Sequence, residues 1–367
     1  MAQLSHILAP IDGRFGSGPS KVRPEQVAVL SGAPLGTSHR QQPVKQLVGN
    51  IRRGLAELFA LPEDYEVLLG NGGASALWDA IPFNLVESTA QIAVIGEFSG
   101  KAARAVTRAP WLEGHSVVET TPGKMITNHD EAGIDSYLYA HNETSTGAVS
   151  PLRRYGDAKS ALTIVDGTSI AGGVNFNPRD VDFYYFSPQK CFAADGGLWL
   201  AFASPAAIER IERLQSQRWV PDFLNLQIAL ANSRKDQTLN TPAISTLSLL
   251  HSQVNWMLEN GGLSQMASRS KKSSQFIYDW AINHPLASPF IKEEEHRSPV
   301  VTTIDFDASV PAKEISASLR QQGIVDIDPY RSLGRNQLRI ATFPAIDFAD
   351  VEALVSCINK EIERLAH

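Results

Sequence analysis

Lys190 lies in an unusual place for a lysine, between two apolar segments. It follows the aromatic run 183–186 and the tripeptide Ser-Pro-Gln, and a second apolar run, LWLAFAS, begins at Leu198. A loop lysine is most often solvated, but one that is partly desolvated between core segments has a lowered pKa and becomes an amine nucleophile. Its position therefore makes Lys190 a candidate catalytic residue.

Asp166 and a glycine-rich segment also follow apolar runs. Asp166 ends LTIV, and GNGGAS (residues 70–75) overlaps the end of EVLLG and opens a helical pattern. Each feature alone has an ordinary explanation, an N-cap or turn for Asp166 and a tight turn for the glycines. Glycines at a helix N-terminus also let backbone N–H groups approach an anion, although the segment matches neither GxxxxGK[ST] nor GxGxxG.

These three features together match what pyridoxal 5′-phosphate (PLP) requires. Its aldehyde forms a Schiff base with a lysine, its pyridinium nitrogen pairs with an acid, and its phosphate binds at a helix N-terminus. Lys190, Asp166 and residues 70–75 supply these groups in one chain. Phe98 could add a ring that stacks on the pyridine, although plain core packing explains Phe98 when it is considered alone.

A mostly parallel sheet is the scaffold that the sequence predicts for these residues. The predicted strands are 66–70, 91–96, 115–119, 136–144, 161–169 and 182–187, and the predicted helices are 43–60, about 98–108, and one after residue 75 that Pro82 disturbs. Runs that are apolar at successive positions indicate strands buried on both faces, and their alternation with helices predicts an α/β fold.

Ligands in such a sheet bind beyond the carboxyl ends of the strands. The segments that follow the predicted strands should therefore meet at one edge of the sheet, and they are 70–75, 96–98, 141–144, 166–168 and 187–190.

The pattern changes after about residue 260. A long helix is followed by strands at 298–306 and 336–344, with helices near 312–322 and 347–365. This order predicts a smaller α+β domain. We expect a large PLP-binding domain of residues 16–260 and a small domain formed by residues 1–15 and 261–367.

Composition and charge narrow the class of protein. The 367 residues carry 33 basic and 39 acidic side chains, and this balance argues against nucleic-acid binding. No apolar run is long enough to span a membrane, and the N-terminus lacks a signal-peptide pattern. The two cysteines, Cys191 and Cys357, give neither a disulfide framework nor a zinc motif. We expect a soluble, cytoplasmic protein.

Seven segments carry a resemblance to a known family. They are FGSGPSKV near the N-terminus, TSHR (37–40), HNETSTG (141–147), VDGTSIAGG (165–173), SPQK (187–190), LNTPA (239–243) and QLRIATFP (337–344). With these segments the chain resembles the phosphoserine aminotransferases, and most closely the actinobacterial type. The resemblance implies a fold-type I PLP enzyme of class V, with a large α/β domain whose sheet is mostly parallel and a smaller α+β C-terminal domain.

This resemblance implies a role for each cofactor-binding position. Lys190 would form the Schiff base, Asp166 would pair with the pyridinium nitrogen, and Phe98 would replace a ring-stacking tryptophan. The other implied contacts are Thr144 near the ring hydroxyl and Ala74, Ser75, Thr168 or Ser169, and Gln189 around the phosphate. The partner's Asn240 and Thr241 would complete the phosphate site, which implies a homodimer. No metal is expected. GNGGAS lacks the arginine that the family often carries in a GGGRG loop.

Substrate binding follows from the same resemblance. Arg339 would bind the α-carboxylate bidentately, and His39 and Arg40 would bind the distal phosphate or side-chain carboxylate. The family often has a histidine before Arg339, and here Arg331 or Arg335 takes its place. The implied reaction converts 3-phosphohydroxypyruvate and L-glutamate to O-phospho-L-serine and 2-oxoglutarate. Some members also act on 3-hydroxy-2-oxo-4-phosphobutanoate in pyridoxine synthesis, and the sequence leaves this open here.

Four other functions compete with this one. A related PLP aminotransferase could use pyruvate or glyoxylate instead. A desulfurase needs a mobile cysteine, which neither Cys191 beside Lys190 nor Cys357 in a helical pattern provides. A metal-dependent phosphohydrolase would need the unpatterned set His129, Asp130, His141 and Glu143. A non-catalytic PLP-binding regulator would need a DNA-binding domain, for which no segment is left.

Overall fold

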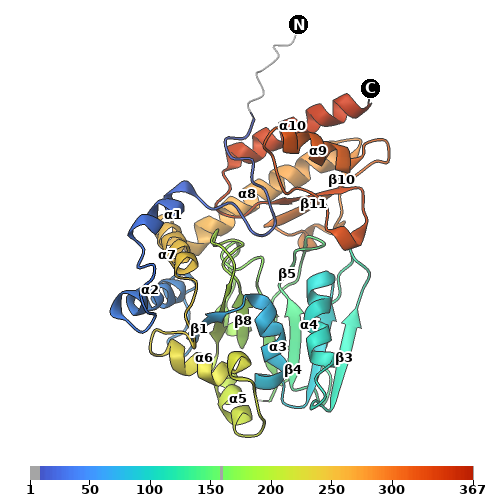
Figure 1. Cartoon of the computed structure of the whole chain (residues 1–367). Coiled ribbons are helices and arrows are strands. Elements are labelled where there is room, and N and C mark those ends of the chain that lie inside the picture. The colour runs from blue at the N-terminus through green and yellow to red at the C-terminus, as the bar shows by residue number, and fades with distance from the viewer. Residues whose placement is uncertain (1–8, 158–159, 367) are drawn as a thin grey trace.

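Seven strands form the larger sheet, and six of them are parallel (Figure 1). The computed structural model describes residues 9–157 and 160–366. The sheet order is β1-β9-β8-β7-β4-β2-β3, and only β9 runs antiparallel to its neighbours. The strands are β1 (Glu66–Asn71), β2 (Thr89–Val94), β3 (Gly114–Glu119), β4 (Ser136–Ala140), β7 (Leu162–Asp166), β8 (Phe183–Phe186) and β9 (Leu198–Ala203).

Both faces of this sheet are covered, as the apolar runs predict. Along β8, Tyr184 and Phe186 pack into the hydrophobic cluster on one face, whereas Phe183 and Tyr185 pack into the cluster on the other. Successive side chains of a strand point to opposite faces, so a strand covered on both sides must be apolar throughout. The predicted α/β class with a mostly parallel sheet is confirmed.

Helices from different parts of the chain cover the two faces. The face with Tyr184 is covered by α2 (Gln42–Leu58) and α7 (Ile244–Glu259). The opposite face is covered by α3 (Ala74–Asn84), α4 (Glu97–Thr107), α5 (Pro205–Gln215) and α6 (Leu226–Ser233). The chain also forms α1 (Pro24–Ala28), η1 (Val29–Gly32), η2 (Pro178–Asp180) and η3 (Asp222–Leu224).

Three details differ from the sequence-based expectations. Pro82 does not end α3, which continues to Asn84, because the proline ring is buried in the core near the end of the helix. β2 begins at Thr89, two residues before the predicted strand. The predicted strand 136–144 is split into β4 and the short β5 (Asn142–Glu143), which pairs with β6 (Ala148–Val149).

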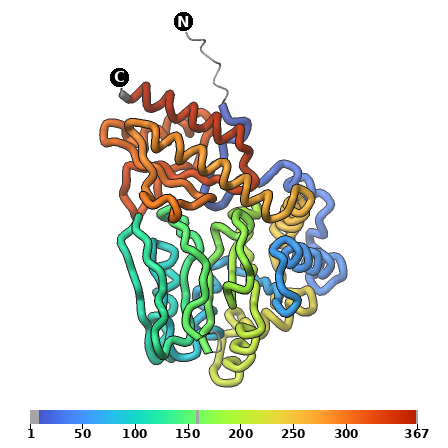
Figure 2. Tube along the Cα trace, turned by 180° about the vertical axis from the view of Figure 1, so that it is seen from behind, coloured from blue at the N-terminus to red at the C-terminus, as the bar shows by residue number. Residues whose placement is uncertain are grey.

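A smaller antiparallel sheet lies above the larger one in Figures 1 and 2. Its order is β10 (Ala287–Pro289), β11 (Val301–Phe306) and β12 (Gln337–Ala341). It packs on α8 (Gly262–Asn283), α9 (Ala312–Gln321) and α10 (Phe348–Ala366), which share one hydrophobic cluster with it. Two single-turn helices, η4 (Glu294–His296) and η5 (Arg331–Leu333), lie in its loops. Residues 1–8 and 367, predicted for the small domain, and 158–159, predicted for the large one, lie outside the described residues.

The first described residues are bound to the C-terminal third of the chain. The N–H of Ile11 donates to Asp350 Oδ1 at 2.7 Å, and the carbonyl of Gly13 accepts from Val325 at 2.8 Å. The carbonyl of Phe15 accepts from Ala341 of β12 at 3.0 Å. The segment then continues from the small sheet to the edge of the large sheet, where Ser17 lies beside Lys190.

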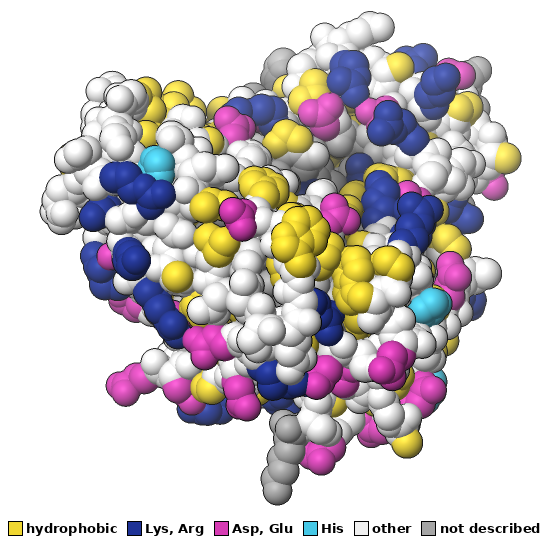
Figure 3. All heavy atoms as spheres, turned by 60° about the horizontal axis from the view of Figure 1, so that its bottom comes forward, with side chains coloured by type: hydrophobic (Ala, Val, Ile, Leu, Met, Phe, Trp, Pro, Cys, Tyr) yellow, Lys and Arg dark blue, Asp and Glu magenta, His cyan; other side chains and the backbone are white. Residues whose placement is uncertain are grey.

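The surface shows no single dominant charge on the face drawn in Figure 3, where basic and acidic side chains are interspersed and apolar side chains gather in the middle. In the part of the chain that the structure describes, no helix is long and apolar enough to cross a membrane.

Candidate active site

One cavity of about 260 Å³ opens at the carboxyl ends of the parallel strands. It receives residues from all five segments that were expected to meet at this edge. Its lining comprises Gly72, Gly73, Ala74, Ser75, Trp78, Phe98, Ala140, Asn142, Thr144, Asp166, Thr168, Ser169, Gln189, Lys190 and Gly197. The structure thus brings together nine of the residues singled out in the sequence: Ala74, Ser75, Phe98, Thr144, Asp166, Thr168, Ser169, Gln189 and Lys190.

Lys190 presents a buried amine to this cavity, with the residue 9% exposed. Its Nζ donates to the carbonyl oxygen of Ser17 at 2.5 Å. Burial, reinforced by the positive charge of Arg339, lowers the pKa of Lys190 to about 8. Desolvation disfavours the charged ammonium, so a much larger share of this amine than of an ordinary lysine is neutral and nucleophilic near neutral pH.

Gly18 makes room for the lysine side chain. Its φ is +129°, in the region that favours glycine, and a Cβ at this position would collide with Lys190 Nζ. Ser20 holds the backbone of the lysine, because its Oγ donates to the carbonyl of Lys190 at 2.7 Å. The segment 17–20 and the lysine are therefore built as one unit.

Asp166 lies at the end of β7 with both carboxylate oxygens engaged. Oδ1 accepts the N–H of Thr168 at 2.8 Å, and Oδ2 accepts the indole N–H of Trp78 at 3.0 Å. The carboxylate therefore has a fixed orientation at the cavity wall.

The N-terminus of α3 forms another part of the cavity wall. Gly73 precedes the helix with φ +70°, which allows the tight turn from β1. The N–H of Ala74 already donates to Ser187 Oγ at 2.7 Å. Ser75 lies in the first turn, where backbone N–H groups lack intrahelical partners and the helix dipole favours an anion. This geometry suits a phosphate group.

Three buried polar atoms of the cavity residues have no hydrogen-bond partner: Asn142 Oδ1, Thr168 Oγ1 and Gln189 Oε1. Buried polar groups in proteins are almost always paired, so these atoms point to a polar ligand. Ser169 differs, because its Oγ accepts from Asn142 Nδ2 at 2.8 Å and donates to the Asn142 carbonyl at 3.2 Å. The residues present fit PLP: an amine, an acid and a helix N-terminus surround atoms that lack partners.

Phe98 forms the aromatic wall of the cavity. Its ring lies 6.5 Å from the ring of Trp78 and 5.4 Å from that of Tyr330. The buried Glu143 fixes this end of α4, since its carboxylate accepts the N–H of Phe98 at 3.2 Å and that of Ser99 at 2.9 Å. The ring position is thus set by a capped helix N-terminus.

Arg339 approaches the site from β12 of the small sheet. Its Nη1 donates to the carbonyl of Thr144 at 3.2 Å, and its guanidinium lies 5.3 Å from the ring of Tyr330. Its Nε is buried without a partner, and burial lowers the pKa of Arg339. An arginine with an unpaired buried N–H is prepared to bind an anion such as a carboxylate.

The two arginines that precede Arg339 differ in their contacts. Arg335 forms an ion pair with Asp305 at 2.5 Å and lies over the ring of Phe290. Arg331, in η5, has no hydrogen bond or ion pair with any residue that the structure describes. The neighbouring Tyr330 contacts Phe98, so η5 lies near the cavity.

The remaining predicted residues lie outside the cavity together with Asn71, and we call this group the Asn71 cluster (His39, Arg40, Asn71, Asn240 and Thr241). Asn71 Nδ2 contacts the side chain of Asn240, and Thr241 Oγ1 lies 3.1 Å from His39 Nδ1. Arg40 donates to Asn232, Gln237 and the carbonyl of Leu239. None of these residues lines the cavity of its own chain.

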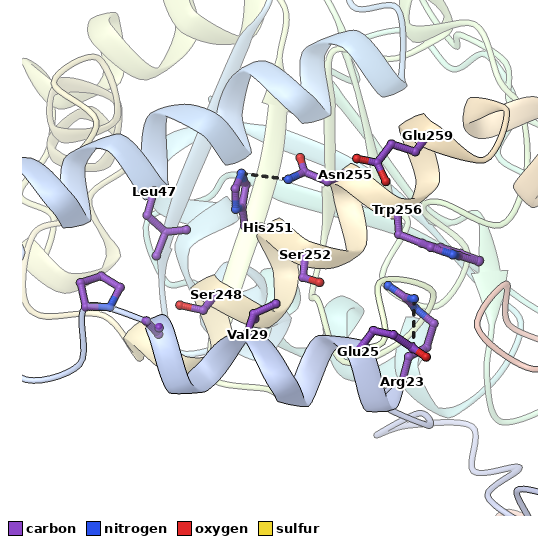
Figure 4. A pocket seen from close by; sticks show the side chains of 13 residues that line it. Arg23, Glu25, Val29, Leu47, Ser248, His251, Ser252, Asn255, Trp256 and Glu259 are labelled. Carbon is purple, nitrogen blue, oxygen red and sulfur yellow. Dashed lines mark hydrogen bonds and ion pairs between the residues drawn. The ribbon is translucent and has the colours of Figure 1, made fainter.

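A second hollow, of about 470 Å³, lies between η1 and α7 (Figure 4). Four of its labelled side chains are engaged in pairs: His251 bonds to Asn255, and Arg23 pairs with Glu25. It holds neither a buried lysine nor a strand-end acid, so we place the chemistry in the Lys190 cavity.

The metal-dependent alternative finds no support in the geometry. Within residues 9–157 and 160–366, no three His, Cys, Asp or Glu side chains are placed to hold a metal ion. His141 bonds to the hydroxyl of Tyr184 at 3.0 Å, and burial lowers its pKa to about 3. Glu143 caps α4, whereas the side chains of His129 and Asp130 are largely exposed.

Sequence reasoning missed four residues of the site: Ser17, Trp78, Asn142 and Ser187. Ser187 and Asn142 lie inside the quoted segments SPQK and HNETSTG, so closer attention to polar side chains there could have found them. Trp78 lies one helical turn after Ala74, on the face that α3 turns to the cavity. Ser17 acts through its carbonyl, which no side-chain pattern reveals.

Comparison with known proteins agrees with this geometry. A family model described as Aminotransferase class-V matches residues 26–326. The chain is 48% identical to the phosphoserine aminotransferase of Nocardioides sp. over 99% of each chain. It is 52% identical to that of Corynebacterium glutamicum over 95% of this chain and 94% of the relative. The chain therefore belongs to the class V aminotransferases, and within them to the phosphoserine aminotransferase family.

A solved structure supports the same fold. The phosphoserine aminotransferase from Cytophaga hutchinsonii matches with a TM-score of 0.88 at 24% identity, covering 96% of this chain and all of the other. The resemblance drawn from the seven sequence segments is confirmed, as is its actinobacterial character.

Proposed function

We propose that this chain is a PLP-dependent aminotransferase that converts 3-phosphohydroxypyruvate and L-glutamate to O-phospho-L-serine and 2-oxoglutarate. The observation that carries the chemistry is the buried amine of Lys190 in a cavity that also holds Asp166 and three unpaired polar atoms. The full-length identity to phosphoserine aminotransferases carries the choice of substrate.

The cavity residues hold the cofactor in distinct ways. Lys190 Nζ is the attachment point, and Asp166 pairs with the ring nitrogen. Ser75, Thr168 and Gln189 bind the phosphate, and we choose Thr168 over Ser169 because the hydroxyl of Ser169 is already paired. Ala74 shapes the helix N-terminus, while Phe98 and Thr144 line the ring.

Lys190 moves the proton in this reaction. When bound, PLP supplies an electron sink that stabilises negative charge at the α-carbon of the amino acid. Lys190 Nζ takes the α-proton of the amino acid and returns it as general acid. A pKa of about 8 suits both roles, because the amine exchanges a proton readily near the working pH.

In this proposal three arginines bind the substrate: Arg339, Arg331 and the partner's Arg40. Arg339 binds the α-carboxylate through its fork of N–H groups. Arg331 binds the distal phosphate or side-chain carboxylate, because Arg335 is committed to Asp305. The partner's His39 and Arg40 add to this distal site. Two anionic substrates of different length can then share one set of cations.

The position of the Asn71 cluster supports a homodimer. Because its residues lie outside their own cavity, we propose that they act in the cavity of a second copy, with the partner's Asn240 and Thr241 at the cofactor phosphate. We further propose that residues 16–260 form the large domain and that 1–15 and 261–367 form the small one. Two unpaired, buried cysteines suit a reducing cytoplasm.

The visible spectrum of the purified protein tests the proposal. PLP should give a band that L-glutamate converts to the amine form of the cofactor and that 3-phosphohydroxypyruvate restores. A protein that stays colourless with PLP would refute the cofactor assignment. Faster restoration by pyruvate or glyoxylate would instead support the alternative aminotransferase. Arg339→Ala should weaken both conversions and leave the band itself intact.

Whether the enzyme also serves pyridoxine synthesis is tested in the same assay. Restoration of the band by 3-hydroxy-2-oxo-4-phosphobutanoate at a rate comparable to 3-phosphohydroxypyruvate would assign that second reaction.

A further inference from the structure

Trp78 has an indole that reaches the acid of the cavity. It lies on α3, one turn after Ala74, and lines the cavity. Its Nε1 donates to Asp166 Oδ2 at 3.0 Å. Asp166 Oδ1 is held separately by the N–H of Thr168 at 2.8 Å. The two donors belong to different elements, so together they fix the rotation of the carboxylate about its side-chain bonds.

The hydrogen bond from Trp78 leaves the Asp166 carboxylate able to accept a further hydrogen bond. A carboxylate oxygen has two lone pairs, so Oδ2 can accept from Trp78 and from a second donor at the same time. A third polar group stands nearby: Tyr185 lies opposite Asp166 on β8, and burial together with the Asp166 charge raises the pKa of Tyr185 well above its usual range. Its hydroxyl therefore stays protonated and cannot place a second negative charge beside the acid.

Other tryptophans show that a bonded indole is not by itself a functional feature. Trp111 donates to the carbonyl of Pro82 at 3.0 Å and stacks on Phe83, at the other end of α3. Trp280 donates to Asn359 at 2.8 Å in the small sheet region. Both serve packing. Trp78 differs because its acceptor is Asp166, an acid that lines the cavity.

We propose that Trp78 is a positioning residue that orients the Asp166 carboxylate and thereby sets the proton affinity of the cofactor ring nitrogen. This inference rests on the proposed function, because it assigns the ring nitrogen of PLP to Asp166. A hydrogen bond to a charged group contributes more than one between neutral groups, so its loss should be measurable without removal of the acid.

The bond can be tested without cofactor. In cofactor-free protein labelled with 15N-tryptophan, the indole signal that disappears in Trp78→Phe is that of Trp78. Asp166→Ala should move this signal to the position of an unbonded indole and leave the Trp111 signal in place. If Trp78→Phe is stable enough to assign the signal, a Trp78 signal that does not respond to Asp166→Ala would overturn the proposal. If it is not, the proposal is overturned when no indole signal moves in Asp166→Ala.

The role is tested by the cofactor spectrum. In Trp78→Phe, the dissociation constant for PLP should rise about tenfold. We expect the ring nitrogen to hold its proton less firmly in this variant, because Asp166 is less well oriented. The ring then carries less positive charge near the nitrogen supplied by Lys190, and that nitrogen holds its own proton more firmly. The pH midpoint of the visible band should therefore move up by about half a unit or more. A purely structural role would lower the melting temperature and leave this midpoint unchanged.

Trp111→Phe is the matched control, because it removes an indole N–H that donates to the same helix, α3, at Pro82 and not to Asp166. It should leave the PLP dissociation constant and the midpoint at wild-type values. If wild-type protein binds PLP and Trp78→Phe shows the wild-type midpoint, the role of Trp78 is refuted while the proposed function stands. If wild-type protein itself binds no PLP, the proposed function fails.

Discussion

The Lys190 cavity and the Asn71 cluster contain the two sets of residues that the sequence singled out, and they differ in how far one chain completes them. The cavity has a lysine, an acid and a helix N-terminus around a common space, with three unpaired atoms. In the Asn71 cluster, Arg40 donates to three acceptors of its own chain. The cluster includes neither Lys190 nor Asp166. We propose that one chain supplies most of the cofactor site, and that a second chain adds residues for binding the cofactor phosphate and the substrate.

The largest effect is expected inside the cavity. Lys190→Ala removes the only attachment point we assign to the cofactor and should lower turnover at least roughly 1,000-fold, with loss of the visible band. Stopped-flow spectra with L-glutamate measure this. Lys235→Ala, which changes an exposed lysine, should retain wild-type turnover. Turnover within tenfold of wild type in Lys190→Ala would show that the chemistry lies elsewhere.

The Asn71 cluster is tested by Arg40→Ala. We expect kcat/KM for 3-phosphohydroxypyruvate to fall about 100-fold, as loss of a charged hydrogen-bonding partner predicts, while the visible band persists. Arg234→Ala, which removes a surface ion pair with Glu66, should change kcat/KM less than about twofold.

Subunit mixing then decides which cavity Arg40 serves. Half of the dimers in an equal mixture of Lys190→Ala and Arg40→Ala chains are hybrids. Each hybrid has one cavity with both residues intact if Arg40 acts across the interface. Activity should then recover to about a quarter of wild type. No recovery after verified subunit exchange would place Arg40 in the site of its own chain.

The pKa of Lys190 predicts a third effect. Because the folded-state pKa is lowered from 10.5 to about 8, the neutral share of the amine rises with pH, reaches one half near pH 8 and levels off above about pH 9. The rate of cofactor capture by PLP-free protein should rise about 50-fold from pH 6 to pH 8 and little above pH 9. Free lysine with PLP provides the reference. A rate still rising tenfold between pH 9 and pH 10 would mean an unshifted amine.

The smallest effect concerns the arginines before β12. Arg331→Ala should lower kcat/KM for 3-phosphohydroxypyruvate about tenfold, since Arg331 has no described partner and is free to bind an anion. Arg335→Ala should change it less than about twofold, because Arg335 is held by Asp305. If steady-state kinetics show the larger loss of kcat/KM in Arg335→Ala, Arg335 and not Arg331 binds the anion.

The fold was predictable from the sequence because buried parallel strands have a plain signature. The aromatic run of β8 is apolar at every position since its neighbours cover both faces. The same reasoning placed Asp166 and Lys190 at strand ends, where ligands bind. Pro82 shows the limit of local rules, because its burial in the core outweighs the hydrogen bond that proline removes from α3.

The finer parts of the site depend on contacts that no pattern encodes. Trp78 bonds to Asp166 across 88 positions, and the Ser17 carbonyl meets Lys190 across 173. Only the three-dimensional arrangement distinguishes Thr168, whose hydroxyl is unpaired, from Ser169, whose hydroxyl is paired. Sequence reasoning therefore identified the types of group and the edge of the sheet, and left the choice between neighbours open.

The N-terminal segment has a consequence for how the enzyme is made. Ile11, Gly13 and Phe15 are bonded to Asp350, Val325 and Ala341, and the same segment brings Ser17 to Lys190. Chains emerge from the ribosome N-terminus first, so these residues are synthesised long before their partners exist. The large sheet can begin to form during translation. The bonds that hold this segment form only after β12 and α10 have been made, so we expect a chain truncated before them to lack the support that places Ser17 against Lys190.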